Sequence, residues 1–283
     1  MIRIHTYILE EHLILVMLKV LFKLAGCLTI AVALPTALVR DPSTSGSVRA
    51  INHLNSIDSH RKGLPQNDAT SKIENIEARF SSCPSVSQLI DGDVNNSGPG
   101  VELTNADNED RTFFVYRNSC DNIPAKYIRI RSGETRFVSL PSDFQGRITR
   151  GTEKWNLMGL ARPLATWVEI TVDPQGTIWG DVSLIKGCDG AATLESLDGS
   201  NLKVGFDNWV LDGAPDAAYS VKPSGTRVIA GTENTLVNIL SAPRDWLAQK
   251  IGYEKVYIDD YHGNPVISST NGRFAVTFYP GRP

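Results

Sequence analysis

Two acidic residues, Glu169 and Asp181, lie in the segment TWVEITVDPQGTIWGDVSL, each among apolar residues and tryptophans. Paired carboxyl groups can break glycosidic bonds: one with a raised pKa protonates the leaving oxygen, and the other activates water or stabilises the developing cation. Trp167 and Trp179 flank the two acids and offer flat apolar faces on which a sugar ring can lie. The residue types suggest a carbohydrate site, provided that the chain brings the two acids together.

The turn between the two acids decides whether they meet. DPQG, from Asp173 to Gly176, has Asp at the first position of a type I turn, Pro at the second and Gly at the fourth. A type I turn followed by a left-handed glycine makes a three-residue hairpin loop with a bulge. In that register Asp173 faces Thr177, and Glu169 lies directly opposite Asp181. A two-residue loop would shift the register by one and send the acids to opposite faces.

Alternation then separates the hairpin into two faces. The core face is expected to carry Val168, Ile170, Val172, Gly180, Val182 and Leu184, and the other face Trp167, Glu169, Thr171, Trp179, Asp181 and Ser183. Two acids that face each other need a cation, a shared proton or an exposed setting. Arg147 and Arg150 are the nearest candidate cations in the sequence. An exposed sheet face with scattered charges is the other interpretation, and spacing alone favours it.

The N-terminal third predicts export. Two lysines precede an apolar run, Leu24–Leu34, which contains the small residues Ala31-Val32-Ala33. This run is shorter than the about 20 residues that span a bilayer, so residues 1–33 are predicted to be a signal peptide, with Met17 as an alternative start. A membrane anchor or a buried helix is the alternative. We expect a secreted, extracellular protein, with the cell wall as one location.

Residues 34–110 are polar and rich in turn-forming residues, and they are predicted to be a linker or pro-segment that precedes a folded domain at residues 111–283. Cys27 lies in the signal, which leaves Cys83, Cys120 and Cys188 as disulfide candidates for at most one internal bond. The sequence leaves open which two form it. Asn95, in Asn95-Asn96-Ser97, is a candidate N-glycosylation site.

Other chemistry has little support. The formal net charge is −3, with no basic region, so a nucleic-acid partner is not expected. Only His262 lies within residues 111–283, so a Ser-His-Asp triad or a histidine-rich metal site would depend on that residue alone. We therefore expect no metal and no cofactor.

The folded domain is predicted to be all-β. Short runs rich in β-branched and aromatic residues alternate with turn signals, which is typical of a β-sandwich. The runs are TFFVYRN, KYIRIRSG, TRFVSLP, TWVEITV, TIWGDVSL, KVYIDD and RFAVTFYP. One helix is expected from Ser241, as N-cap, to the closing Gly252.

From Thr112 onward the chain resembles the thaumatin-like family, which includes osmotin. TFFVYRNSC resembles the family's opening strand, and RSGETRFVSLP with QGRITRGT resembles the two segments that follow. VEITVDPQGTIWGDVSLIKG resembles its central hairpin, with a Gly seven residues and an Asp twelve residues after the Glu; NGRFAVTFYP resembles its closing strand.

This resemblance implies a flattened β-sandwich with an acidic cleft, β-1,3-glucan binding, weak glucan hydrolysis or antifungal activity. Glu169 and Asp181 would take the catalytic positions, with Glu169 as general acid and Asp181 as base or stabiliser. The implied substrate-binding residues are Arg147 or Arg150, Trp167, Trp179, and Asp259 or Asp260.

The chain also departs from the family. It has few cysteines, Ile178 stands where the family has a second cleft acid, and Tyr279 replaces the closing cysteine. The family's disulfide-rich second lobe is reduced to a segment from about Asp189 to Lys255. Two hypotheses remain for what we expect to be a monomer: a secreted protein that binds cell-wall β-glucan, or a non-enzymatic effector, antigen or wall protein on the same scaffold.

Overall fold

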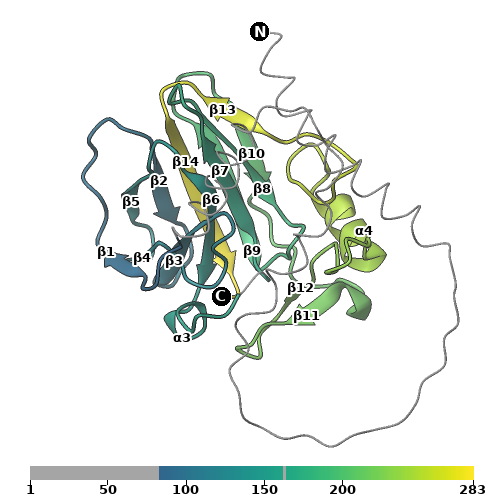
Figure 1. Ribbon diagram of the computed structural model, residues 1–283. Coiled ribbons are helices and arrows are strands. Elements are labelled where there is room, and N and C mark those ends of the chain that lie inside the picture. Colours follow the sequence, from purple (N-terminus) through teal and green to yellow (C-terminus); the bar gives the residue numbers. More distant parts are fainter. Residues whose placement is uncertain (1–82, 162–163) are drawn as a thin grey trace, which may run out of the picture. The chain divides into compact units, whose positions relative to one another are not determined.

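A computed structural model describes residues 83–161 and 164–283. The expected signal peptide, the alternative start at Met17 and most of the expected linker lie outside these residues. Three β-sheets and short helices make up the described part of the chain (Figure 1). None of its helices is long and apolar enough to cross a membrane.

The larger sheet has seven strands and carries the hairpin that the sequence singled out. Its order is β1-β4-β3-β6-β7-β8-β13, and only β1 and β4 are parallel. The strands are β1 (Gln88–Ile90), β3 (Arg111–Arg117), β4 (Lys126–Ile130), β6 (Gln145–Gly151), β7 (Trp167–Val172), β8 (Ile178–Ser183) and β13 (Ile267–Ser269). β6, β7 and β8 lie side by side in its middle.

The second sheet has five strands in the order β10-β9-β14-β2-β5. They are β2 (Gly100–Asn105), β5 (Thr135–Ser139), β9 (Gly190–Ser196), β10 (Lys203–Phe206) and β14 (Arg273–Gly281). The third sheet is the hairpin of β11 (Tyr219–Val221) and β12 (Arg227–Ile229), which follows the 3-10 turn η1 (Asp216–Ala218).

The two larger sheets pack face to face around one hydrophobic core. Val168 and Val182 are fully buried, as alternation along the hairpin predicts. The rings of Phe113 and Phe278, from different sheets, lie 5.0 Å apart between centroids. A side chain at Gly180 would collide with Leu194 of the opposite sheet, so this close approach requires glycine. The expected all-β sandwich is confirmed.

The short helices lie outside the sandwich sheets. α3 (Glu153–Asn156) follows β6, and α4 (Ser241–Lys250) is the helix expected from the sequence. Its cap differs from the expectation, because Leu240 occupies the N-cap and Ser241 is already helical. Proline at the third helical residue is compatible with this start, since the first turn needs no proline N–H.

The domain begins earlier than residue 111. β2 lies within the expected linker, yet it pairs with β14 on one side and β5 on the other, and its Val101 and Leu103 are fully buried. Its sequence, GVELTN, is short and half polar, so it gives only a weak strand signal. The expected boundary was therefore wrong, and part of the expected linker is core.

Two further assignments are corrected. KVYIDD is not a strand: Tyr257 forms only an isolated bridge to Ser183. The segment from Asp189 to Lys255 was expected to be a reduced second lobe, but its first part forms β9 and β10 of the five-stranded sheet. Within this segment, the elements outside the two large sheets are η1, the β11–β12 hairpin and α4.

The cysteines resolve the pairing that the sequence left open. Cys83 and Cys120 form a disulfide with a Cα–Cα distance of 5.4 Å, which ties the start of the described chain to the loop after β3. Cys188 is a free, buried thiol. Burial raises the pKa of Cys188 to about 11, so its thiolate is scarce at neutral pH.

Candidate functional site

The β7–β8 hairpin has the register that its turn predicts. Glu169 pairs with Asp181 across the strands. The Gly176 N–H donates to the Asp173 carbonyl over 2.9 Å, and Gly176 has φ of 86°. Asp173 also accepts the N–H of Thr177 on its side chain, which closes the bulged loop. Local turn chemistry thus places the two carboxyl groups side by side on the face away from the core.

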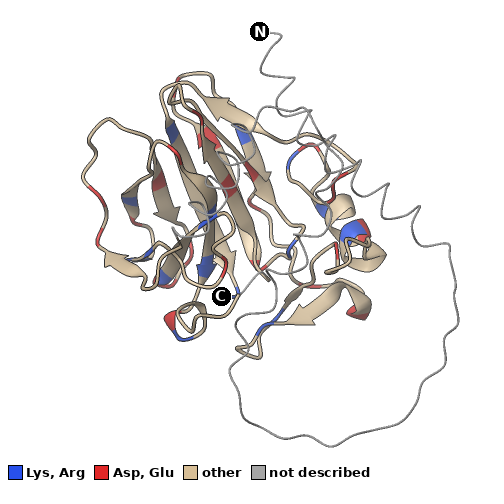
Figure 2. Ribbon diagram, viewed as in Figure 1, with Lys and Arg blue, Asp and Glu red and all other residues tan. Residues whose placement is uncertain are grey.

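Arg147 extends this pair into a row across three strands. It pairs with Glu169 from β6, so the order across the sheet is Arg147, Glu169, Asp181. Arg147 is 3% exposed, and its guanidinium carbon lies 4.0 Å from the centroid of the Trp167 ring and 4.6 Å from that of Tyr116. It also forms a 2.7 Å ion pair with Asp121. The charged residues of this sheet can be followed on its ribbon in Figure 2.

The two carboxyl groups have different surroundings. Burial and the charge of Glu169 raise the pKa of Asp181 well above its ordinary value, and one oxygen of Asp181 is buried without a hydrogen-bond partner. Burial also raises the pKa of Glu169, but a hydrogen bond from Ser183 and the charge of Arg147 act against this. The pKa of Asp181 is therefore raised further than that of Glu169, because Asp181 lacks the nearby positive charge and hydroxyl donor that act on Glu169.

Three further residues lie near the pair. Ser183 is on the same face of β8, as alternation predicted, whereas Lys186, which adds a positive charge near Glu169, was not anticipated. Tyr257 reaches the site through its bridge to Ser183, and burial and the charges of Asp181 and Asp260 raise its pKa. No local signal in the sequence marks Tyr257, because its place depends on the bridge to Ser183.

The structure distinguishes between the two candidate acids after Tyr257. Asp260 is exposed, and its charge raises the pKa of Glu169, so it lies within reach of the pair. Asp259 is buried and holds its own loop: its carboxylate accepts the N–H groups of Tyr261 and His262 and contacts the His262 ring at 2.9 Å. Asp259 is therefore not a substrate-binding residue of this site.

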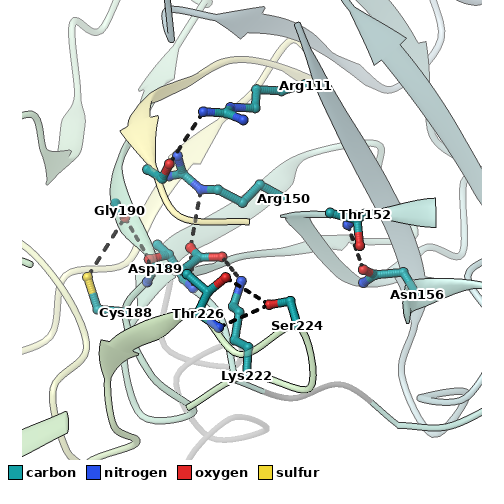
Figure 3. Close-up of polar contacts among 12 residues, drawn as sticks. Arg111, Arg150, Thr152, Asn156, Cys188, Asp189, Gly190, Lys222, Ser224 and Thr226 are labelled. Atoms are coloured by element: carbon teal, nitrogen blue, oxygen red, sulfur yellow. Dashed lines mark hydrogen bonds and ion pairs between the residues drawn. The ribbon is translucent and has the colours of Figure 1, made fainter. Parts of the chain in front are cut away.

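Arg150 is also placed elsewhere, which corrects the expectation that it is an alternative to Arg147. It lies three residues further along β6 and points to the other face of the sheet. There it is 1% exposed, donates to the carbonyls of Tyr279 and Ala191, and lies 3.2 Å from Asp189 (Figure 3). Arg147 is the arginine of the acid pair.

The two tryptophans differ in what they offer. Arg147 covers one face of the Trp167 ring, so that face is not free for a sugar. Trp179 is half-buried, and its indole N–H donates to Asp173 over 3.2 Å. No stacked ring or cation covers its ring faces in the ring contacts of the described residues. Trp179 is the better platform.

Other candidate positions lie apart from the acid pair. Asn95 is exposed in the loop between β1 and β2, where a glycan has room, and its glycosylation stays a prediction. In the described residues no group of three or more His, Cys, Asp or Glu side chains is placed to hold a metal ion. Two pockets, of about 170 and 440 Å³, are lined by residues other than Glu169 and Asp181.

Fold and site together define an all-β sandwich protein with a partly buried carboxyl pair beside Arg147 on the outer face of its larger sheet. No protein-family model and no curated protein matches the sequence. One solved structure it resembles is the protein elicitor MoHrip2 from Magnaporthe oryzae, with a TM-score of 0.31 and 8% identity. That match covers 65% of this chain and 100% of the other.

Proposed function

We propose that this is a secreted protein that binds a cell-wall β-glucan on the outer face of the larger sheet, around Glu169 and Asp181. The observation that carries the proposal is the register that sets these two acids opposite each other beside Arg147. Two adjacent, partly buried carboxyl groups lower the stability of the fold, so a purely structural role does not explain why both are present. Perturbed carboxyl groups of this kind gather at functional sites.

The surroundings of the pair suit a sugar. A protonated Asp181 donates a hydrogen bond, the Glu169 carboxylate accepts one, and a hydroxyl group both donates and accepts. Trp179 adds an apolar ring face beside them. The thaumatin-like resemblance of the hairpin motif supports β-1,3-glucan as the polymer, and it remains part of the proposal.

Secretion is supported by the disulfide between Cys83 and Cys120, since such bonds persist in oxidising compartments. The expected signal peptide adds to this. An extracellular wall polymer is then a partner that the protein would encounter.

Slow hydrolysis is the second candidate, favoured by the different surroundings of the two carboxyl groups. In this proposal the roles are exchanged relative to the sequence-based expectation: Asp181, whose pKa is raised further, is the general acid, and Glu169 is the base or stabilising carboxylate.

The test is a pull-down of the secreted protein on insoluble β-1,3-glucan, with the supernatant assayed for released oligosaccharide. Glu169→Gln should abolish release, while Trp179→Ala should weaken binding by roughly tenfold or more, as expected when a stacking ring is lost. Glu195→Gln is the matched control, because Glu195 is an exposed acid on β9 of the other sheet. Binding without release identifies a lectin-like protein, and absence of binding rejects the glucan proposal.

A further inference from the structure

Arg147 lies in a row of side chains on the outer face of the larger sheet. It pairs with Tyr116 of β3 on one side and with Glu169 of β7 on the other. Directly paired residues have Cβ atoms about 4.5–5.5 Å apart, so an arginine and a carboxyl group in this relation can form an ion pair. In the described part of the chain, however, the ion pair of Arg147 goes to Asp121, at 2.7 Å, and not to Glu169.

The position of the guanidinium has a cost. The rings of Tyr116 and Trp167 and the carboxylate of Asp121 surround it, and its Nε is buried without a hydrogen-bond partner. An unsatisfied buried donor lowers stability and calls for an explanation. Of the three surrounding groups, Asp121 is the one that carries a full negative charge. It is therefore the group that competes with Glu169 for Arg147.

The loop after β3 holds Asp121 in place. The preceding residue, Cys120, is 6% exposed and is cross-linked to Cys83. The loop also begins with a hydrogen bond of 2.8 Å from the Asn118 N–H to the carbonyl of Gln145, the first residue of β6. The side chain of Asp121 is 52% exposed, but its backbone is tied to the sheet that carries Arg147.

The charge of Arg147 matters to Glu169. Burial raises the pKa of Glu169, and a hydrogen bond from Ser183 and the charge of Arg147 lower it. Direct contact with Arg147 would lower this pKa further and would occupy carboxylate oxygens. The other titratable groups around Glu169 come from β8 and the segments that follow β8 and α4: Asp181, Lys186, Tyr257 and Asp260.

We propose that Asp121 is a positioning residue of the carboxyl pair, which holds Arg147 away from Glu169 and so leaves the Glu169 carboxylate open to a ligand hydroxyl. The ligand part of this inference rests on the proposed glucan site, whereas the arrangement of Asp121, Arg147 and Glu169 does not. A carboxylate in a bidentate pair with arginine has both oxygens engaged, so it is a poorer acceptor for a sugar.

The first measurement is the pKa of Glu169 in the full chain, by NMR of ¹³C-labelled glutamate carboxyl groups. The signal of Glu169 is the one that disappears in Glu169→Gln. In Asp121→Asn the guanidinium loses its anion and turns to Glu169, so the pKa of Glu169 should fall. Asp121→Glu keeps the charge and should restore the pKa. Asp143→Asn, which removes the exposed partner of Arg117, is the matched control and should leave it unaltered.

A second measurement shows whether Asp121 acts through Arg147. In Arg147→Met the cation is absent, so adding Asp121→Asn should no longer shift the pKa of Glu169. If Arg147→Met does not fold, the Nε–H signal of Arg147 replaces it: this proton gains an acceptor in Asp121→Asn and should move downfield. An unchanged pKa of Glu169 in Asp121→Asn, or a shift of equal size without Arg147, would overturn the proposal.

Binding to insoluble β-1,3-glucan separates this inference from the proposed function. Asp121→Asn should bind several-fold more weakly than the unmodified protein, and Asp121→Glu should recover the binding. If no variant binds glucan but the pKa of Glu169 falls in Asp121→Asn, the glucan is rejected and the positioning of Arg147 stands. If Asp121→Asn binds glucan as well as the unmodified protein and the pKa is unchanged, the positioning role is refuted and the glucan site stands.

Discussion

Replacing Asp181 by Asn should stabilise the protein at neutral pH, although it alters a buried side chain. The substitution keeps the size and removes one of two opposed carboxyl groups. Burial and the charge of Glu169 raise the pKa of Asp181, so the folded protein at neutral pH must hold a proton or carry two adjacent charges. An amide at position 181 avoids both costs.

The sign and size of the effect follow from proton linkage. An unfolded Asp titrates near about pH 3.9, and the folded Asp181 titrates higher. The stability contributed by the bound proton is fully present below the unfolded pKa and is lost as the pH rises to the folded pKa. In this window the folded state binds about one proton more than the unfolded state, so the free energy of unfolding falls by about 1.4 kcal/mol per pH unit.

Acids with a lowered pKa do not obscure this window. A hydrogen bond from Arg282 lowers the pKa of Asp212, and one from Arg129 lowers that of Glu153. Their stabilisation is present above their unfolded pKa values and is lost only as the pH falls through the folded ones. Above about pH 5 they are ionised in both states and contribute no slope.

Urea unfolding followed by tryptophan fluorescence, between about pH 4 and pH 8 at fixed ionic strength, measures the effect. The advantage of Asp181→Asn over the unmodified protein should grow with pH and then level off above the folded pKa. Asp143→Asn, at a side chain 77% exposed, is the control and should show no such growth. A difference between Asp181→Asn and the unmodified protein that does not change with pH would refute the raised pKa of Asp181.

Three other predictions test the fold. Replacing both Cys83 and Cys120 by Ser opens a cross-link spanning 37 residues and should lower the free energy of unfolding by about 4 kcal/mol, measured by urea titration. With Cys27 changed to Ser, a thiol reagent at about pH 8 should label Cys188 only after unfolding, because the buried thiol has its pKa raised to about 11; labelling of the native protein would contradict this. A chain that starts at Arg111 should show no cooperative unfolding by circular dichroism, whereas one that starts at Cys83, the first described residue, should. The shorter chain loses the fully buried Val101 and Leu103, on the order of 3–6 kcal/mol of apolar burial.

The sequence predicted the central hairpin because its determinants are local. Asp173 and Gly176 specify one turn type, the turn specifies the register, and the register brings Glu169 to Asp181. All of this lies within a few residues of the turn, where backbone geometry has few alternatives. Strand periodicity then separates the core face from the outer face without knowledge of the rest of the fold.

Features that depend on distant partners were missed. β2 is a strand because β14 and β5 lie on either side of it, and nothing within GVELTN indicates those partners. Tyr257 reaches the acid pair through an isolated bridge to Ser183, for the same reason. Arg150, in contrast, could have been separated from Arg147, because two residues three apart in a strand point to opposite faces.

The parallel pairing of β2 with β14 bears on the order in which the domain can fold. The hydrogen bond from the Gly281 backbone N–H to Asp107 joins residues 174 apart, and β14 is the middle strand of its sheet. That sheet cannot be completed until β14 has been synthesised, so a chain that lacks β14 has no closed sandwich. Such non-local closure is slow. Cys83 and Cys120 are therefore both present in the chain, and able to form their disulfide, before the sheet around β14 is complete.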